Sequence, residues 1–115
     1  MTEIITTGVI RTYHDKEKTK LKEEYFIHNN KIEGIYKKYY ENGQLLQEVN
    51  YINGKRNGIY KEYHDNGQLK KEVNYINGNK NGILKEYHKN GQIRSEKETV
   101  RNEKIFLIPK RKNYF

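Results

Sequence analysis

The sequence contains no cysteine, no tryptophan, one proline and one methionine among its 115 residues. Without cysteine the chain can form neither a disulfide bond nor a thiolate site, which suits a reducing compartment. No apolar run is long enough to span a bilayer, and the first residues lack the basic start and apolar stretch of a signal peptide. We therefore expect a soluble, cytoplasmic protein.

Apolar side chains are also scarce, because only 33% of the residues are hydrophobic while another 33% are charged. A compact two-layer domain of this length normally buries more apolar surface. The chain has 11 tyrosines instead, whose rings can be buried while their hydroxyls stay hydrated. This composition predicts a single thin domain over residues 1–115, with tyrosine rings and the stems of Lys and Glu covering a sheet.

The net charge of +8 is concentrated at one end of the chain. Residues 1–100 contain 18 basic and 14 acidic side chains, whereas residues 101–115 contain five basic and one acidic. The tail residues Lys110, Arg111 and Lys112 are candidates for contact with nucleic acid, an anionic membrane or an acidic protein face. Three charges are fewer than a lipid-recruiting cluster usually has, which disfavours the membrane.

A unit of 24 residues repeats along the chain. Gly34, Gly58 and Gly82 occupy equivalent positions at this interval, while Gly8 precedes Gly34 by 26 residues. The units cover approximately 8–33, 34–57, 58–81 and 82–104, and residues 105–115 form an apolar and then basic terminal segment. Irregular outer copies are typical of a repeat array with modified ends, and we expect residues 105–109 to cap it.

Asn-Gly pairs separate the β-prone runs of each unit. They stand at 42–43, 66–67 and 90–91 inside the units and at 53–54 and 77–78 near their ends. Asn-Gly between such runs is the strongest short-range hairpin signal, because both residues tolerate positive φ. The fold class is therefore all-β: tandem hairpins that pair into one elongated, twisted antiparallel sheet of roughly seven or eight strands, about 35 Å across.

Charged residues indicate the register of each hairpin. A two-residue type I′ turn at Asn66-Gly67 pairs Lys61 with Glu72 and Glu62 with Lys71. A three-residue bulged turn would instead oppose Lys61 and Lys71, two like charges, although it would gather the apolar side chains on one face. The charges favour the two-residue turn.

The repeat unit resembles the variant MORN repeat. The pattern is Gly-x-Tyr-x-x-Tyr-(His/Tyr)-x-Asn-Gly-x-Leu-x-x-Glu-x-x-Tyr-x-Asn-Gly, which runs from Gly34 to Gly54 and from Gly58 to Gly78. Proteins built from this variant look similar to the YwqK-type antitoxins, which are thought to neutralise partner toxins. The resemblance implies an elongated sheet that acts by binding, as an inhibitor, a scaffold or a phospholipid contact.

No group of residues predicts catalysis, a metal site or a cofactor. His14, His64 and His88 share one repeat position with Tyr40, but equivalent positions in adjacent units lie about 10 Å apart, too far to share one ion. A glutamate recurs once per unit, at positions 24, 48, 72 and 96, and we expect it opposite a lysine each time, as a cross-strand pair.

Aromatic and basic residues are the candidate contacts for a partner. These candidates are Tyr36, Tyr40, Tyr60, His64, Tyr75, His88, Lys38, Lys70 and Lys71, together with the three basic residues of the tail. Rings beside lysines could stack bases and contact phosphate, or could simply cover the sheet.

The function that these observations favour is a non-enzymatic protein-binding module. We expect an inhibitor that docks on a toxin or a nuclease-type effector, because a flat, pre-formed face needs little ordering on binding. Weakly selective binding of RNA or DNA is the first alternative, and binding of lipid or carbohydrate is the second. Self-association through an edge strand remains open as well.

Overall fold

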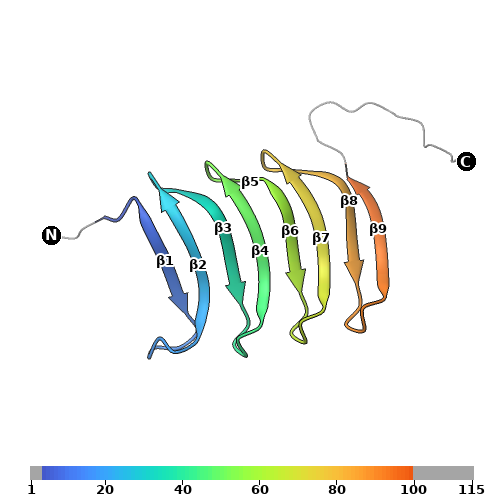
Figure 1. The fold of residues 1–115 in the computed structure, drawn as a ribbon, viewed down its shortest axis with the longest axis horizontal. Helices are drawn as coiled ribbons and strands as arrows, with labels where there is room; N and C mark the ends of the chain where they lie inside the picture. The colour runs from blue at the N-terminus through green and yellow to red at the C-terminus, as the bar shows by residue number, and fades with distance from the viewer. Residues whose placement is uncertain (1–3, 100–115) are drawn as a thin grey trace, which may run out of the picture.

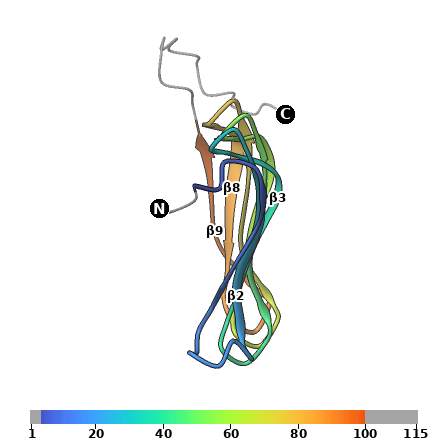
Figure 2. The ribbon, with the colours of Figure 1, turned by 90° about the vertical axis from the view of Figure 1, so that its left-hand side faces the viewer.

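The chain forms an open, single-layer antiparallel sheet. The structure is a computed structural model that describes residues 4–99, so the predicted cap at 105–109 and the basic tail lie outside the described part (Figure 1). Figure 2 shows the sheet nearly edge on, twisted and without a second layer among the described residues. The predicted fold class is therefore confirmed.

Nine strands make up the sheet, and they follow the order of the chain. Their bounds are β1 Gly8–Tyr13, β2 Leu21–His28, β3 Lys31–Tyr39, β4 Leu45–Ile52, β5 Lys55–Arg56, β6 Gly58–Tyr63, β7 Leu69–Ile76, β8 Asn79–Tyr87 and β9 Ile93–Thr99. The path is β1-β2-β3-β4-β6-β7-β8-β9, and the two-residue strand β5 pairs with β4. Among the described residues, β1 and β9 are the edge strands of the sheet (Figure 1).

The predicted charge pairs are present, but the predicted turn is wrong. Lys61 pairs with Glu72 and Glu62 with Lys71. However, Asn66 does not have a positive φ, so Asn66 and Gly67 do not form a type I′ turn. The loop instead contains three residues, 65–67, and is closed by the amide of His64 donating to the carbonyl of Gln68 (2.8 Å), with Gly67 left-handed at φ 92°.

A β-bulge beside the loop allows the three-residue loop and the charge pairs to occur in the same hairpin. Next to the loop the register is that of the bulged turn, and Tyr63 lies opposite Leu69. The register then shifts between Tyr63 and Glu62, where Lys70 is the extra residue, so that Lys71 meets Glu62 and Lys61 is not left facing Lys71. The sheet thus gains the favourable loop without the like-charge pair.

The type I′ turns lie at the opposite end of the sheet, where one unit passes into the next. Asn53 and Gly54 both have positive φ (51° and 83°), as do Asn77 and Gly78 (50° and 89°). Beyond these turns the pairing between units is interrupted beside Gly34, Gly58 and Gly82, whose φ values are 89°, 110° and 99°. These glycines allow a backbone geometry that other residues rarely adopt.

The core lies on one face of the sheet and is small. Its buried residues are Val49, Tyr60, Val73 and Tyr75, and Tyr36, Tyr51 and Leu84 pack against them. Because directly paired residues of antiparallel strands share a face, the pairs Tyr36–Val49 and Tyr60–Val73 place these residues on the same side. The opposite side exposes aliphatic residues such as Ile35 and Ile59, at 49% and 48% exposure.

Candidate functional site

Tyrosine rings gather on the core side of the sheet, which we call the tyrosine face. It is formed by Tyr25, Tyr36, Tyr51, Tyr60 and Tyr75 together with Val49, Val73, Leu84 and Arg56. These residues come from β2 to β8, so the face extends across the middle of the sheet. Strand alternation sends every second side chain to this face, while the neighbours point to the other.

Arg56 lies over two of the rings. Its guanidinium carbon is 4.9 Å from the centroid of the Tyr60 ring and 5.2 Å from that of the Tyr75 ring, within the range of a cation–π contact. Tyr60 and Tyr75 meet edge to face with centroids 6.1 Å apart. The Arg56 guanidinium also donates to the Tyr75 hydroxyl (3.1 Å), and the Tyr60 hydroxyl donates to Glu62 (2.8 Å). Hydrogen bonds therefore fix both rings.

A second cluster of rings surrounds Tyr36. Its centroid is 5.3 Å from that of Tyr25 and 6.1 Å from that of Tyr51, the latter at an edge-to-face angle of 64°. The Tyr36 hydroxyl donates to the carboxylate of Glu23, which also accepts from Thr12 (2.8 Å). Tyr36 and Tyr60 thus share one arrangement: each has a ring that is at least half-buried, and its hydroxyl donates a hydrogen bond to a glutamate carboxylate.

These carboxylates and the burial of the rings alter acid–base behaviour. The hydrogen bond from Tyr36 holds the pKa of Glu23 below its ordinary value. Burial first, and then the hydrogen bonds to Glu23 and Glu62, raise the pKa values of Tyr36 and Tyr60 above the ordinary tyrosine value of 10.0. A hydroxyl that donates to a carboxylate resists deprotonation, because ionisation would place two negative charges side by side.

This arrangement predicts that the protein loses stability in alkali. The folded-state pKa values of Tyr36 and Tyr60 lie above their unfolded values, so stability is complete below pH 10.0 and decreases as the pH rises past it. Ultraviolet absorbance of tyrosinate, followed together with circular dichroism, should show two late-titrating rings that ionise as the sheet unfolds. Replacing both with phenylalanine should remove this late step. Titration of all rings near pH 10 in a folded chain would contradict it.

The repeat position shared by histidine and Tyr40 links neighbouring units at the loop end of the sheet. Nε2 of His14 donates to the carbonyl of Tyr39 (2.9 Å), and Nε2 of His64 donates in the same way to Tyr87 (2.9 Å). The Tyr40 hydroxyl makes the equivalent bond to the carbonyl of Tyr63 (2.6 Å). Histidine and tyrosine can replace each other at this position because each supplies one hydrogen-bond donor to the equivalent carbonyl of the next unit.

The loops are joined by asparagine side chains as well. The amide groups of Asn42 and Asn66 donate to backbone carbonyls of the next loop, those of Asp65 (3.2 Å) and Lys89 (3.0 Å). Their side-chain oxygens accept the amide of the residue two positions on, Gln44 or Gln68. The Asn-Gly loops therefore stabilise the contact between units in addition to reversing the chain.

The candidate lysines lie beside carboxylates on the tyrosine face. Lys38 stands opposite Glu23, and Nζ of Lys70 and of Lys71 are 3.5 and 4.0 Å from Glu62. The structure therefore brings Tyr36, Tyr60, Tyr75 and these three lysines onto one face, while Tyr40 and His64 lie at the loop end and His88 is exposed in the last loop. The binding role of these residues stays a prediction.

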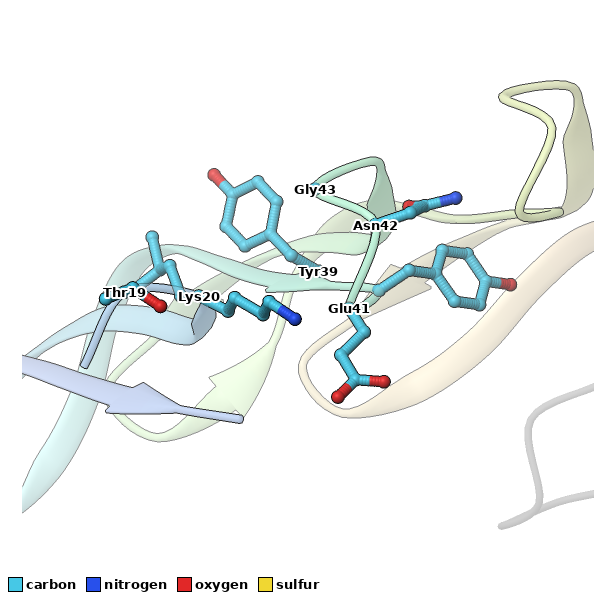
Figure 3. Close-up of a pocket in the computed structure, with 8 residues that line it drawn as sticks. Thr19, Lys20, Tyr39, Glu41, Asn42 and Gly43 are labelled. Atoms are coloured by element: carbon cyan, nitrogen blue, oxygen red, sulfur yellow. The ribbon is translucent and has the colours of Figure 1, made fainter. Parts of the chain in front are cut away.

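A shallow pocket of about 460 Å³ opens at the loop end of the sheet. Figure 3 shows it between the loop of the first unit and the first Asn-Gly loop. Eight residues line it: Thr19, Lys20, Leu21, Tyr39, Tyr40, Glu41, Asn42 and Gly43. Its charged side chains are one lysine and one glutamate, which do not form a catalytic arrangement. Residues 4–99 also contain no group of three His, Cys, Asp or Glu side chains placed to bind a metal ion.

Sequence reasoning did not single out Arg56, Tyr25 and Tyr51. Arg56 follows the type I′ turn and occupies a position where the next unit has Lys80. Tyr25 replaces, in the first unit, the valine of the two central units, Val49 and Val73. Both are departures from the repeat, and that difference between copies was the available signal.

The fold and the two faces define a hairpin-repeat protein with an open sheet. A family model described as the MORN repeat variant matches residues 32–53, 56–77 and 80–101, which is more than half of the chain. The chain therefore belongs to the MORN repeat variant family, whose repeats generally act as non-catalytic binding modules. No curated protein and no solved structure matches the chain.

The second and third matched copies begin two residues after the type I′ turns, at positions 56 and 80. Each match therefore starts two residues before the glycine that marks our unit. The hairpin of β1 and β2 lies before the first match but keeps the geometry of the later ones: Tyr13 opposes Leu21 as Tyr39 opposes Leu45. Within residues 4–99 the structure contains no helix, and thus none long and apolar enough to cross a membrane.

Proposed function

We propose that this chain is a protein-binding module whose tyrosine face docks on another protein and inhibits it. The observation that supports this most is the arrangement of three half-buried rings, Tyr25, Tyr36 and Tyr51, beside a buried pair of rings and Arg56, with orientations that are fixed before any partner arrives. Tyrosine and arginine are enriched among the residues that dominate binding energy at protein interfaces. Rings that are already ordered lose little conformational entropy on binding.

The charges of the tyrosine face favour a protein over a nucleic acid. Glu23 and Glu62 accept hydrogen bonds from the hydroxyls of Tyr36 and Tyr60, so two carboxylates lie beside these rings and would repel a phosphate backbone bound there. Tyr60 and Tyr75 are each 8% exposed and pack against each other, so neither of these two rings offers a free surface on which a base can stack. A protein surface with mixed charges and its own apolar side chains suits this face.

The partner we propose is a toxin or a nuclease-type effector, in keeping with the antitoxin-like repeat. Inhibition would follow from docking that blocks access to the effector or restricts its motion. Imitation of nucleic acid does not fit a chain whose net charge is +8. The flat sheet would act as a rigid cover over a comparably flat surface.

Affinity capture with matched variants tests this proposal. The immobilised chain is compared with Tyr25→Ala/Tyr51→Ala, two half-buried rings at the margin of the tyrosine face, and with Val9→Ala/Ile59→Ala on the opposite face. Circular dichroism must first show that all three are folded. We expect the purified partner to bind the tyrosine variant about thirtyfold more weakly and the control unchanged, and its activity to decrease when the wild-type chain is added.

Other ligands have their own controls in the same experiment. Single-stranded RNA and DNA are titrated at increasing salt, and anionic vesicles and glycans are tested in parallel. Nucleic-acid binding that persists at physiological salt, or binding to vesicles or glycans without any captured protein, would overturn the proposal. Equal loss of the partner in both double variants would also exclude the tyrosine face as the docking surface.

A further inference from the structure

The face opposite the tyrosines, which we call the aliphatic face, has a row of alternating charges. One residue from each of the eight long strands contributes, and every neighbour in the row is a directly paired residue. The row runs Arg11, Glu24, Lys37, Glu48, Lys61, Glu72, Lys85 and Glu96. It begins with a positive charge at one edge of the sheet and ends with a negative charge at the other.

Apolar residues flank this charge row on both sides. Toward the type I′ turns lie Val9, Phe26, Ile35, Ile59 and Ile83, which are between 40% and 54% exposed. Toward the Asn-Gly loops lies a second row made of the directly opposed pairs Tyr13–Leu21, Tyr39–Leu45, Tyr63–Leu69 and Tyr87–Ile93. The aliphatic face is thus a charged stripe between two apolar stripes, all perpendicular to the strands.

Among residues 4–99, most head groups of the charge row have no ionic partner. Arg11 and Glu24 form an ion pair at 2.8 Å, and within residues 4–99 no other two members of the row approach within 4.0 Å. The carboxylates of the tyrosine face differ, because Glu23 and Glu62 already accept hydrogen bonds from tyrosines. The charge row therefore presents side chains that can still pair with opposite charges on another molecule.

A row with an even number of alternating charges has opposite signs at its two ends. When such a row is reversed and laid over itself, each charge therefore meets one of the opposite sign. A two-fold axis that lies between two stacked sheets and runs parallel to the strands reverses the order of the strands but keeps each stripe over itself. Under this rotation Glu48 of one copy meets Lys61 of the other, and Lys37 meets Glu72. Each positive charge consequently faces a negative one along the whole row.

The same rotation also matches the apolar row near the loops. There each tyrosine comes to face an aliphatic side chain of the other copy, as Tyr39 faces Leu69 and Leu45 faces Tyr63. In the other row Phe26 faces Ile83, while Ile35 and Ile59 face Asn74 and Asn50. Because twisted sheets stack at about −30°, the central strands approach most closely and the outer strands diverge. The contacts of β3, β4, β6 and β7 should therefore dominate.

We propose that two copies of this chain associate face to face through their aliphatic faces, in a two-fold symmetric dimer whose charge rows interlock. The proposal does not depend on the partner of the tyrosine face, which stays outside this interface. A second copy fits better than an unrelated protein, since one surface patch satisfies both charge and apolar complementarity with itself. The dimer would supply the second layer that the single sheet lacks.

Site-directed cross-linking tests the geometry, because the native chain has no cysteine. Ile35→Cys and Asn74→Cys are made in separate chains, and both side chains lie on the aliphatic face of central strands. In the proposed dimer these positions face each other across sheets ~10 Å apart, whereas two copies of either position are offset by three strands, ~14 Å. A bismaleimide with a reach of about 10 Å should cross-link the mixture of the two chains and neither chain alone.

Association through the edge strands gives a different result. If β9 of one copy pairs with β1 of another, positions 35 and 74 are five strands apart, ~24 Å, and the mixture gives no cross-link. Sedimentation velocity over a range of concentrations shows whether a dimer forms at all. A monomer at all concentrations, or a dimer without the mixed cross-link, overturns the proposal.

A charge-swapped chain tests whether the charge row directs the association or whether the chains associate non-specifically through their apolar side chains. All eight signs are inverted: R11E, E24K, K37E, E48K, K61E, E72K, K85E and E96K. Every cross-strand pair within the chain keeps one positive and one negative member, so the monomer should fold. The swapped chain is still complementary to itself, but it places like charges opposite those of the wild type.

We expect the swapped chain to form its own dimer, and the mixed dimer with wild type to be roughly tenfold or more weaker than either. The Ile35→Cys and Asn74→Cys variants are made in both the wild-type and the charge-swapped chain. Cross-links should form between two wild-type chains and between two swapped chains, but not between a wild-type and a swapped chain. Free mixing of the two types would show that the charge row does not direct the association, and would overturn the proposed packing.

Discussion

Replacing Tyr60 with alanine should lower the free energy of unfolding by about 3–5 kcal/mol, the range for truncating a buried aromatic ring. Tyr60 is 8% exposed and packs on Val73 and Tyr75, with Arg56 over its ring. A single-layer sheet has no second layer that could collapse into the space. Since small domains are stable by only about 5–15 kcal/mol, this loss removes a large part of the free energy of unfolding.

Two matched variants distinguish the ring from its hydroxyl and from its strand. Tyr60→Phe keeps the ring and removes the hydrogen bond to Glu62, so we expect a loss of about 1 kcal/mol. Ile59→Ala alters the adjacent residue of β6 on the aliphatic face, where the side chain is 48% exposed, and should cost less than Tyr60→Ala. Urea unfolding at low protein concentration measures all three. Equal losses for Tyr60→Ala and Ile59→Ala would mean that the tyrosine face is not the core.

Gly58→Val should destabilise the sheet by about 2–3 kcal/mol through the backbone. Gly58 has a φ of 110°, a region that a β-branched residue rarely enters, and the nearest atom to an added Cβ is that of Asn50 at 3.7 Å, an ordinary contact. The cost therefore arises from conformation and not from a clash. Gly82→Val should behave similarly, because its φ is 99° and no atom lies within 4 Å of an added Cβ.

Thermal unfolding of these glycine variants is compared with that of Ile59→Val, a small change at the next residue. We expect the control to melt close to the wild type and both glycine variants to melt well below it. If Gly58→Val and Gly82→Val have the melting temperature of the wild type, the backbone at these connections between units does not have the positive φ values given above.

The repeat period, the sheet and its charge pairs could be predicted because they depend on local signals that recur. Four copies of a glycine, three of an internal Asn-Gly pair and three of a Lys–Glu spacing all indicate the same hairpin array. The turn at Asn66-Gly67 could not be derived from the same signals, because a two-residue and a three-residue loop use the same residues. Only the extra residue at Lys70 shows how both the loop and the charge pairs are satisfied.

The candidate site was predictable in part. Three of the five tyrosines and the three lysines of the tyrosine face were identified. Whether a ring binds a partner or fills the core depends on which face of the strand is covered, and alternation alone does not reveal that. Tyr40 and His64 occupy the same repeat position, and the difference between them suggested a functional role. In the structure both make the same kind of contact, a hydrogen bond to a backbone carbonyl of the next unit. Arg56 contacts Tyr60, four residues on, and Tyr75, 19 residues on, and its signal in the sequence was its difference from Lys80 of the next unit.

The two faces of the sheet have different chemistry, and this difference supports two separate roles. On the tyrosine face the polar groups are already engaged with one another, and the rings form a fixed surface. On the aliphatic face most charged head groups of the row remain available, between two partly exposed apolar stripes. A sheet one layer thick can therefore bind a partner on one side and a second copy on the other.

Side-chain footprinting by hydroxyl radicals tests this assignment of the faces most directly. Tyr51 and Ile59 report the tyrosine face and the aliphatic face, and their oxidation is compared in the monomer, in the dimer and in the complex with the captured protein. We expect the dimer to protect Ile59 but not Tyr51, and the captured protein to protect Tyr51 in addition. Protection of Ile59 by the captured protein with Tyr51 still oxidised would contradict the assignment.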